Sequence, residues 1–162
     1  MQKRSFLKVL AVFFAGTQLA PGGGAFATTR PVVEVWKDPD CGCCKDWVKH
    51  LEDSGFDVTA HDSGNTTARA RLGIPAKLGS CHTGQVGGYA VEGHVPARDI
   101  QRLLTERPKA VGLAVPAMPV GSPGMDGAVY GKRKDAYDVL LVKVDGSTSI
   151  FKSYSSKSST AS

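Results

Sequence analysis

Three of the chain's four cysteines lie within four consecutive positions, in the segment DPDCGCCKDW (residues 38–47). Cys41 and Cys44 have the C-x-x-C spacing of dithiol redox enzymes. With Cys43 they also form a C-x-C-C cluster, a set of thiolates that suits a soft metal ion. The segment therefore predicts either thiol–disulfide exchange or metal binding.

Structural disulfides are the alternative for an exported chain with four cysteines. The spacing argues against them, because adjacent residues such as Cys43 and Cys44 cannot easily bridge each other. Cys43 also argues against a simple dithiol enzyme, since a third thiol beside the attacking and resolving cysteines offers a competing disulfide. Soft metal ions can use every sulfur of the cluster, bridging sulfurs included. The third cysteine therefore favours metal binding.

Further soft ligands occur in three short segments later in the chain. SCHT carries Cys81 and His82, VEGHVP carries His94, and MPVGSPGM carries Met118 and Met125. Thiolate, thioether and imidazole together suit copper, and Cu(I) in particular. Each residue also has a structural alternative: a buried cysteine or half-cystine, a polar strand residue, or a packing methionine. These residues support a copper site only if the fold brings them close to the cysteine cluster.

The segments on either side of the cysteines predict the local structure that positions them. Residues 31–38 are rich in β-branched side chains and predict a buried strand, which Pro39 ends. Apolar residues recur at helical spacing through residues 44–51 and predict a helix that starts at the cysteines, with Asp38 or Asp40 as its cap. A helix start favours the thiolate form of nearby cysteines. Thiolate serves both redox attack and metal binding, so this placement leaves both hypotheses open.

The remaining predicted elements complete an α/β fold. Residues 56–62 alternate in polarity and predict a second strand, and residues 65–75 predict a short helix. Two further strands are expected around Gly87–Gly88, and residues 96–108 predict a third helix. This order, with the cysteines after the first strand, predicts a thioredoxin-like βαβαββα domain. His50 falls on the polar face of the first helix, where we expect it to be solvated.

The character of the chain changes after Pro108. Residues 110–127 are rich in glycine and proline, which excludes regular structure throughout, but are too apolar for a free linker. We expect them to pack over the domain surface, followed by a β-hairpin that turns at Asp145–Gly146. The predicted organisation is a thioredoxin-like domain (28–108), an irregular C-terminal extension with the hairpin that contributes to the metal site (109–154), and a disordered tail (155–162).

Residues 1–27 have the features of a secretory signal peptide. Lys3, Arg4 and Lys8 precede an apolar run, and the small-x-small sequence AFA predicts cleavage after Ala27. A membrane anchor is the alternative, but the run is short for a membrane-spanning helix. Cleavage removes three basic residues and no acidic ones, so the net charge falls from +5 to +2 and indicates no binding to nucleic acid or membrane. We expect a monomer in the periplasm of a Gram-negative bacterium.

Two runs within residues 32–126 resemble a known family. They are VWKDPDCGCCKDWVKHLEDSGF and GIPAKLGSCHTGQVGGYAVEGHVPARDIQRLLTERPKAVGLAVPAMPVGSPGMD, and they are similar to the exported C-x-C-C proteins called CopG-type copper-resistance proteins. The resemblance implies a thioredoxin-like domain whose C-terminal extension helps to bind copper through bridging cysteine sulfurs. It also implies interconversion of Cu(I) and Cu(II) and partners in a copper efflux or oxidase system. The ligands that it implies are Cys41, Cys43, Cys44 and Cys81, flanked by His94, Met118 and Met125.

We therefore predict a periplasmic copper-binding protein for copper resistance, which holds Cu(I) in a cysteine-bridged site. Activity as a copper oxidoreductase is open at this stage, as is the number of ions. Two alternatives remain. The first is a thiol–disulfide oxidoreductase that uses Cys41 and Cys44, and the second is a copper chaperone without a redox step.

Overall fold

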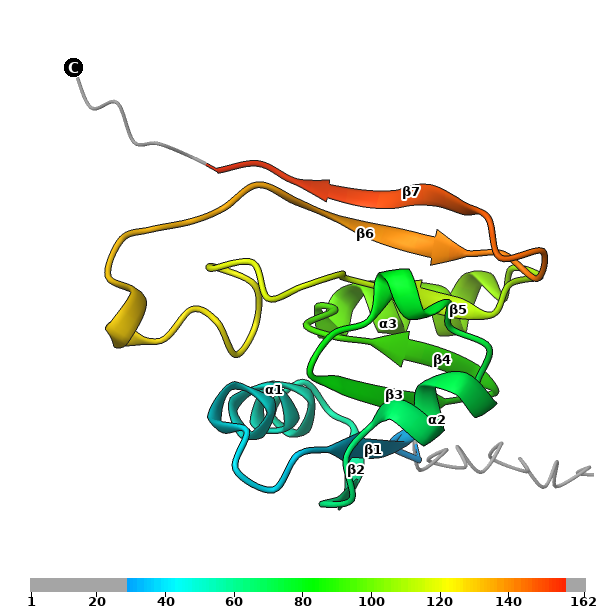
Figure 1. Cartoon of the computed structure of the whole chain (residues 1–162), viewed down its shortest axis with the longest axis horizontal. Coiled ribbons are helices and arrows are strands. Elements are labelled where there is room, and N and C mark those ends of the chain that lie inside the picture. Colours follow the sequence, from blue (N-terminus) through cyan, green and yellow to red (C-terminus); the bar gives the residue numbers. More distant parts are fainter. Residues whose placement is uncertain (1–28, 157–162) are drawn as a thin grey trace, which may run out of the picture.

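The computed structural model describes residues 29–156, which form a mixed α/β fold around one seven-stranded sheet (Figure 1). The strand order is β2-β1-β3-β4-β5-β6-β7, and three α-helices accompany the strands in the described part of the chain. The predicted signal peptide and residues 157–162 of the predicted tail lie outside the described residues. No helix within residues 29–156 is long and apolar enough to cross a membrane.

The first half of the sheet carries the helix that begins at the cysteine cluster. β1 (Val32–Lys37) pairs in parallel with β2 (Asp57–His61) and antiparallel with β3 (His82–Val86). α1 (Gly42–Asp53) connects β1 to β2. The sequence predicts these elements correctly, because a buried β-branched strand and an amphipathic helix both have strong periodic patterns.

The next elements confirm the predicted order strand-helix-strand-helix-strand-strand-helix. α2 (Thr66–Arg71) and a short 3₁₀ turn (Ala76–Leu78) lead to β3. β4 (Tyr89–Glu92) pairs antiparallel with β3, and α3 (Ala97–Glu106) follows it. Pro96 stands at the cap position of α3 and lies just before the first turn in which it was predicted.

The sheet continues into the C-terminal region through a strand that the sequence interpretation missed. β5 (Gly112–Ala114) pairs in parallel with β4 and antiparallel with β6 (Tyr137–Val142), which forms the predicted hairpin with β7 (Thr148–Tyr154). With only three residues, β5 is too short to show an alternating pattern. Glycine is required at its first position, because a Cβ on Gly112 would lie 1.8 Å from the carbonyl oxygen of Ala90.

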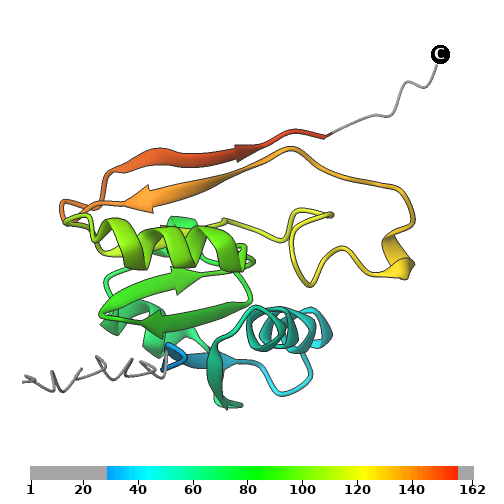
Figure 2. The same ribbon diagram turned by 180° about the vertical axis from the view of Figure 1, so that it is seen from behind.

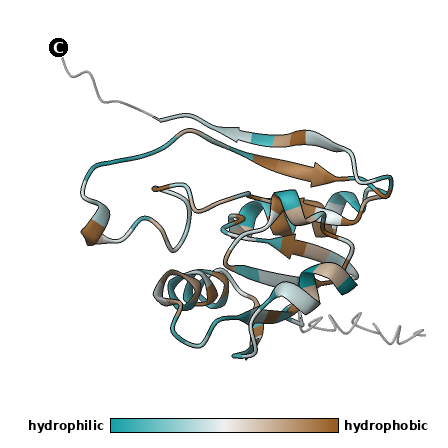
Figure 3. Ribbon diagram, in the orientation of Figure 1, coloured by the Kyte–Doolittle hydropathy of each residue, from teal (hydrophilic) through white to brown (hydrophobic). Residues whose placement is uncertain are grey.

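Helices cover both faces of the sheet. α1 and α3 contribute Trp47, Leu51, Ile100 and Leu103 to the larger core, whereas Ile74 and Leu78 belong to a second core on the α2 side. Figure 1 shows α2 in front of the sheet, and Figure 2 shows α3 on the opposite face. Coloured by hydropathy, β6 is largely apolar, whereas the helices carry both polar and apolar residues (Figure 3).

The irregular segment between β5 and β6 turns back toward the start of α1 (Figure 1). It contains a short 3₁₀ turn (Ala128–Tyr130) and packs closely at Gly124, where a Cβ would lie 2.6 Å from the carbonyl oxygen of Cys43. Gly124 also has a φ of +83°, which disfavours other residues. The expectation that this segment packs over the domain is therefore confirmed.

His50 joins α1 to α3 and is half-buried, not fully solvated as the sequence suggested. Its Nε2 atom accepts a hydrogen bond of 3.1 Å from the backbone N–H of Ala97, the first residue of α3. An unpaired N–H at a helix start needs such a partner, and here the partner comes from a different helix. The contact requires the neutral imidazole, since a protonated ring has no acceptor.

Replacing His50 by glutamine should make stability less dependent on pH, because glutamine accepts a hydrogen bond without titrating. Burial lowers the pKa of His50 below 6.5, against the opposing effects of Asp126 and Asp53. The unfolded chain therefore binds a proton that the folded chain does not, and stability falls as the pH drops below about 6.5. Urea denaturation between pH 7 and 5 should give a shallower slope for the variant, by at most about 1.4 kcal/mol per pH unit. Equal slopes would contradict the role of His50.

Candidate metal centre

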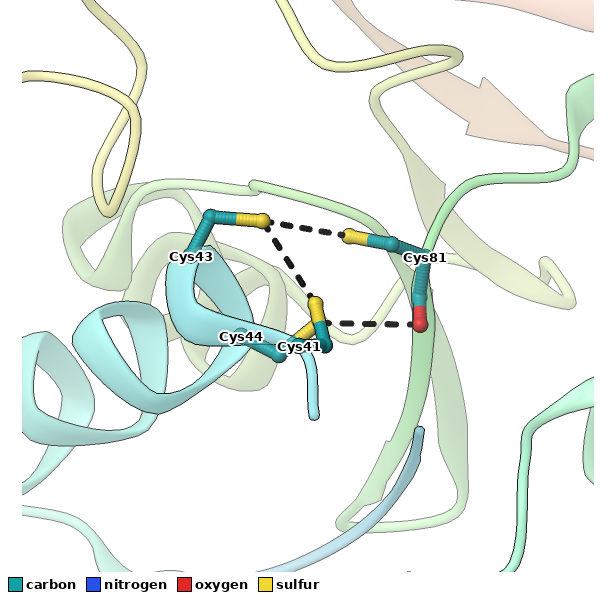
Figure 4. A group of neighbouring side chains, drawn as sticks. All are labelled: Cys41, Cys43, Cys44 and Cys81. Carbon is teal, nitrogen blue, oxygen red and sulfur yellow. Dashed lines mark hydrogen bonds between the residues drawn. A yellow bond between two sulfur atoms is a disulfide. The ribbon is translucent and has the colours of Figure 1, made fainter. Parts of the chain in front are cut away.

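The four cysteine sulfurs lie together where α1 meets the start of β3 (Figure 4). All four Sγ atoms are within 4.8 Å of one another. Cys43 Sγ is 3.5 Å from Cys41 Sγ and 3.9 Å from Cys81 Sγ, so it stands between the two segments. The fold thus brings together a thiol cluster from positions about forty residues apart in sequence.

Two of these cysteines form a disulfide, Cys41 to Cys44, and the other two are free. Cys44 is fully buried and its Sγ lies 3.6 Å from the carbonyl oxygen of Cys81, whereas Cys41 is partly exposed. The C-x-x-C pair therefore supports a dithiol–disulfide couple, and Cys43 faces Cys81 outside it. The cluster offers two thiols in this state and four when the disulfide is reduced.

The turn before α1 leaves the helix start open toward the sulfurs. The backbone N–H of Asp40 donates a hydrogen bond to the side chain of Asp38. The backbone N–H of Cys41 donates one to the backbone carbonyl oxygen of the same residue. Cys41 is the cap residue, and no side chain caps the helix. The expectation that Asp38 or Asp40 caps α1 is therefore wrong, because Asp38 is used in the preceding turn.

Two histidines meet the fourth cysteine on the sheet side of the site. Cys81 Sγ is 3.2 Å from His94 Nε2 and 3.3 Å from His82 Nδ1. Burial first, and the neighbouring Cys43 second, raise the pKa of the Cys81 thiol to about 12. Without a metal the group is thus a neutral thiol, and a bound cation would have to displace its proton.

His94 is oriented by the C-terminal extension. Its Nδ1 lies 2.8 Å from the carbonyl oxygen of Pro123, to which it can only donate, so in the neutral ring Nε2 is left unprotonated. Burial lowers the pKa of His94, which favours this neutral form. The unprotonated Nε2 faces Cys81, and this is the arrangement in which histidines bind metals.

His82 is, like His94, a residue that the sequence left undecided between a ligand and an ordinary polar residue. The side chain is completely buried, with its ring centroid 4.2 Å from that of Trp47 and 4.9 Å from that of His94. Burial, and then the nearby His94, lower its pKa well below 6.5. His82, His94 and Cys81 together form a second group of three potential ligands that shares Cys81 with the thiol cluster.

Comparisons with known proteins fit this geometry. A solved structure named "Copper resistance protein copG- Form 2" is 51% identical, with a TM-score of 0.71, over 77% of this chain and 98% of that one. The chain belongs to the CopG copper-resistance family. The form 1 structure matches similarly, at 51% identity and a TM-score of 0.70 over 76% and 97% of the two chains.

A family model described as a protein of unknown function, DUF411, matches residues 78–125. That range holds Cys81, His94 and both candidate methionines but not the C-x-C-C segment. No curated protein matches the chain. The sequence resemblance to the CopG family is therefore confirmed by the solved structures.

The two candidate methionines of this CopG-family chain differ in their surroundings. Met125 is buried, and its sulfur accepts a hydrogen bond of 3.2 Å from the Tyr130 hydroxyl. Met118 is 49% exposed and lines a surface depression with Pro116 and Pro119. The structure brings together the four cysteines and His94, whereas the ligand roles of Met118 and Met125 stay predictions.

Proposed function

We propose that this chain is a periplasmic copper-resistance protein that holds Cu(I) through the thiolates of its four cysteines. The observation that supports this most directly is the approach of four sulfurs within 4.8 Å, from two separate segments. Thiolates so close together can share an ion or bridge several ions, and soft thiolates suit Cu(I). The names of the two similar structures agree with copper as the metal.

The contacts around the cluster suggest a separate role for each of the two parts of the chain. The βαβαββα part, residues 28–108, would be a thioredoxin-like domain that supplies the cysteines at the start of α1. The extension, residues 109–154, would contribute by fixing His94 through the Pro123 carbonyl oxygen. His94, and more remotely Met118 and Met125, would then be flanking ligands that complete the coordination of copper.

A redox role is the finer part of the proposal. The Cys41–Cys44 disulfide gives the site a two-electron couple beside the free thiols of Cys43 and Cys81. Such a couple would allow the site to exchange electrons with copper: reduction of the disulfide by two electrons, with two protons taken up, would balance oxidation of two Cu(I) ions to Cu(II), and the reverse step would return both ions to Cu(I). A chaperone without a redox step would use the same ligands, and cycling of the bound copper between its two oxidation states would separate the two.

The same disulfide favours a second candidate function, a thiol–disulfide oxidoreductase that uses Cys41 and Cys44. Partly exposed Cys41 would be the attacking thiol and buried Cys44 the resolving one. This function requires turnover of a disulfide substrate in the absence of copper. A copper chelator should then leave the activity unchanged.

Export determines the compartment in which we propose that the protein acts. The signal peptide over residues 1–27 would deliver the mature chain to the periplasm, where copper reaches a Gram-negative cell first. Its partners there would be copper ions and a copper efflux or oxidase system, and we propose that the mature chain acts as a monomer.

Metal analysis and copper-edge X-ray absorption on the reduced mature protein, purified without oxygen, would test the main proposal. We expect more than one copper ion per chain, coordination dominated by sulfur, and a short copper–copper distance. Less than one ion per chain, or coordination dominated by nitrogen and oxygen, would rule out a cysteine-bridged site.

A further inference from the structure

Cys81 is not held by the sheet, although it supplies the fourth sulfur. β3 begins one residue later, at His82. The peptide groups before Cys81 are held instead by side chains from other elements. The backbone N–H of Ser80 donates to Glu92 Oε1 at 2.7 Å, and the Ser80 carbonyl oxygen accepts from Arg69 Nη2 at 2.6 Å. Asn65 Nδ2 adds a second donor to this carbonyl oxygen at 3.1 Å.

Glu92 and Arg69 also bind each other, so that Glu92, Arg69 and the Ser80 backbone form a closed ring of hydrogen bonds. Arg69 Nε lies 2.8 Å from Glu92 Oε1, while Glu92 Oε2 accepts from the Thr83 hydroxyl at 2.6 Å. The Glu92 side chain is 0% exposed and that of Arg69 is 16% exposed. Both carboxylate oxygens are therefore satisfied, by donors from α2, from β3 and from the loop before β3. The Arg69 guanidinium uses two of its nitrogens at fixed separation to reach both Glu92 and Ser80.

The surrounding backbone leaves little freedom for this arrangement to shift. A Cβ on Gly79 would lie 2.9 Å from Arg69 Nη1, and one on Gly93 would lie 2.7 Å from the Ser80 side chain. Gly93 also has a φ of +70°, which glycine adopts readily. The Ser80 hydroxyl in turn donates to the carbonyl oxygen of Ala117 in the C-terminal extension, at 2.6 Å.

A buried ion pair is weak evidence for stability, because removing both charges from water costs about as much as their attraction returns. Here the Arg69–Glu92 pair matters because it fixes the position of the backbone before Cys81. Second-layer groups that orient ligands are a general feature of metal sites, and their loss lowers metal affinity. Glu92 lies in β4 and Arg69 in α2, so the pair fixes the Cys81 segment to two elements at once.

We propose that the Arg69–Glu92 pair is a positioning device that holds Cys81 close enough to the C-x-C-C cysteines to share copper with them, with its Sγ 3.9 Å from that of Cys43. The inference rests on the proposed copper site, and neither residue is proposed as a ligand. The pair acts through the Ser80 peptide groups and the length of the two side chains, and not through its charge alone.

Arg69→Lys tests the proposal, because the single nitrogen of lysine cannot place two donors at the fixed separation of Arg69 Nε and Nη2. Arg71→Lys is the matched control, on the same helix, where Arg71 is exposed and its guanidinium lies 4.7 Å from the Trp36 ring centroid. Competition with a chromophoric Cu(I) chelator, on the reduced mature chain, should show a loss of about 10- to 100-fold in affinity for Arg69→Lys. Arg71→Lys should bind as the wild type does. Equal affinity for the two variants overturns the proposal.

Two variants of Glu92 distinguish a role in positioning the Cys81 segment from a role of the carboxylate charge. Glu92→Asp keeps the charge but is one methylene too short to reach Ser80 and Thr83 together. Glu92→Gln keeps the length, and its amide oxygen can still accept from Ser80 and Arg69 while Thr83 accepts from its NH₂ group. Positioning predicts weaker copper binding for Glu92→Asp than for Glu92→Gln, and a purely electrostatic role predicts the reverse order. The reverse order overturns the proposal.

Separate controls test whether each variant folds and whether the wild-type chain binds copper at all. Circular dichroism and thermal midpoints identify any variant that does not fold. If Arg69→Lys does not fold, the comparison of the Glu92 variants decides, and if none of the three folds, the pair is structural and the proposal is wrong. If the wild type binds no Cu(I), the proposed function fails. Alkylation of Cys81 by iodoacetamide, mapped by mass spectrometry, then tests position alone: faster alkylation in Arg69→Lys supports the proposal, and an unchanged rate overturns it.

Discussion

Replacing Cys43 by serine should reduce the copper capacity of the reduced chain from several Cu(I) ions to one at most. Cys43 Sγ lies between Cys41 Sγ, at 3.5 Å, and Cys81 Sγ, at 3.9 Å. It is therefore the sulfur that can bridge ions bound by the C-x-x-C pair to ions bound by Cys81. A hydroxyl at this position is a hard, protonated group that binds Cu(I) poorly.

The measurement is an anaerobic titration with Cu(I) in the presence of a chromophoric chelator, which gives both stoichiometry and affinity. Lys45→Ser is the control, because Lys45 is exposed in the same helix two residues further along. It should leave both quantities unchanged. The cluster is the wrong description if Cys43→Ser and Lys45→Ser bind the same number of ions with the same affinity.

The same variant separates copper binding from thiol–disulfide exchange. An oxidoreductase that uses Cys41 and Cys44 should keep its activity in Cys43→Ser and lose it in Cys41→Ser. Copper binding by the full cluster should be impaired in both variants. The pattern of losses across the two assays therefore identifies which function the C-x-C-C segment serves.

The sequence predicts the parts of the site that depend on local patterns. The C-x-C-C cluster at the start of α1 follows from a β-branched strand, a proline and a helical repeat, all within about twenty residues. The approach of Cys81 and His94 follows less directly, from the soft-ligand character of the residues and from the resemblance to the CopG family. These predictions hold because each element has a strong periodic signal of its own.

Contacts between distant elements could not be predicted in the same way. Glu92 is a charged residue in a four-residue strand, and nothing local indicates that Arg69, 23 residues earlier, pairs with it in the interior. His50 lies on the polar face of α1, yet it accepts a bond from a backbone N–H 47 residues away. Charged and polar residues are expected at the surface, so a buried pair becomes visible only when the packing of the whole chain is known.

The choice between a ligand and a core residue is also decided by the tertiary structure. His82 opens β3 and has the alternation of a strand residue, which is equally consistent with solvent or core. Only the fold shows that the ring packs against Trp47 at a tilt and that its Nδ1 atom points toward Cys81. The disulfide between Cys41 and Cys44 is a similar case, because the spacing permits both a disulfide and a metal site.

The oxidation state of that disulfide should control how much copper the chain can hold. Metals bind thiolates, and neither sulfur of the Cys41–Cys44 disulfide is a thiolate. The oxidised chain therefore keeps only the thiols of Cys43 and Cys81, with His94 beside them. We expect it to bind one Cu(I) ion at most, whereas the reduced chain, with four thiols, binds more than one.

Reduction consumes two electrons and two protons, which an external dithiol supplies as it is itself oxidised to a disulfide. The attack should occur at Cys41, because Cys44 is fully buried and Cys41 is partly exposed. Thiol counts of two and four per chain would identify the two preparations before each is titrated with Cu(I) without oxygen. A chain with Cys41→Ser and Cys44→Ser should show the low capacity whether or not it has been treated with reductant. Equal capacity of the oxidised and reduced wild-type chains would mean that Cys41 and Cys44 are not copper ligands, and that the C-x-x-C pair serves thiol chemistry alone.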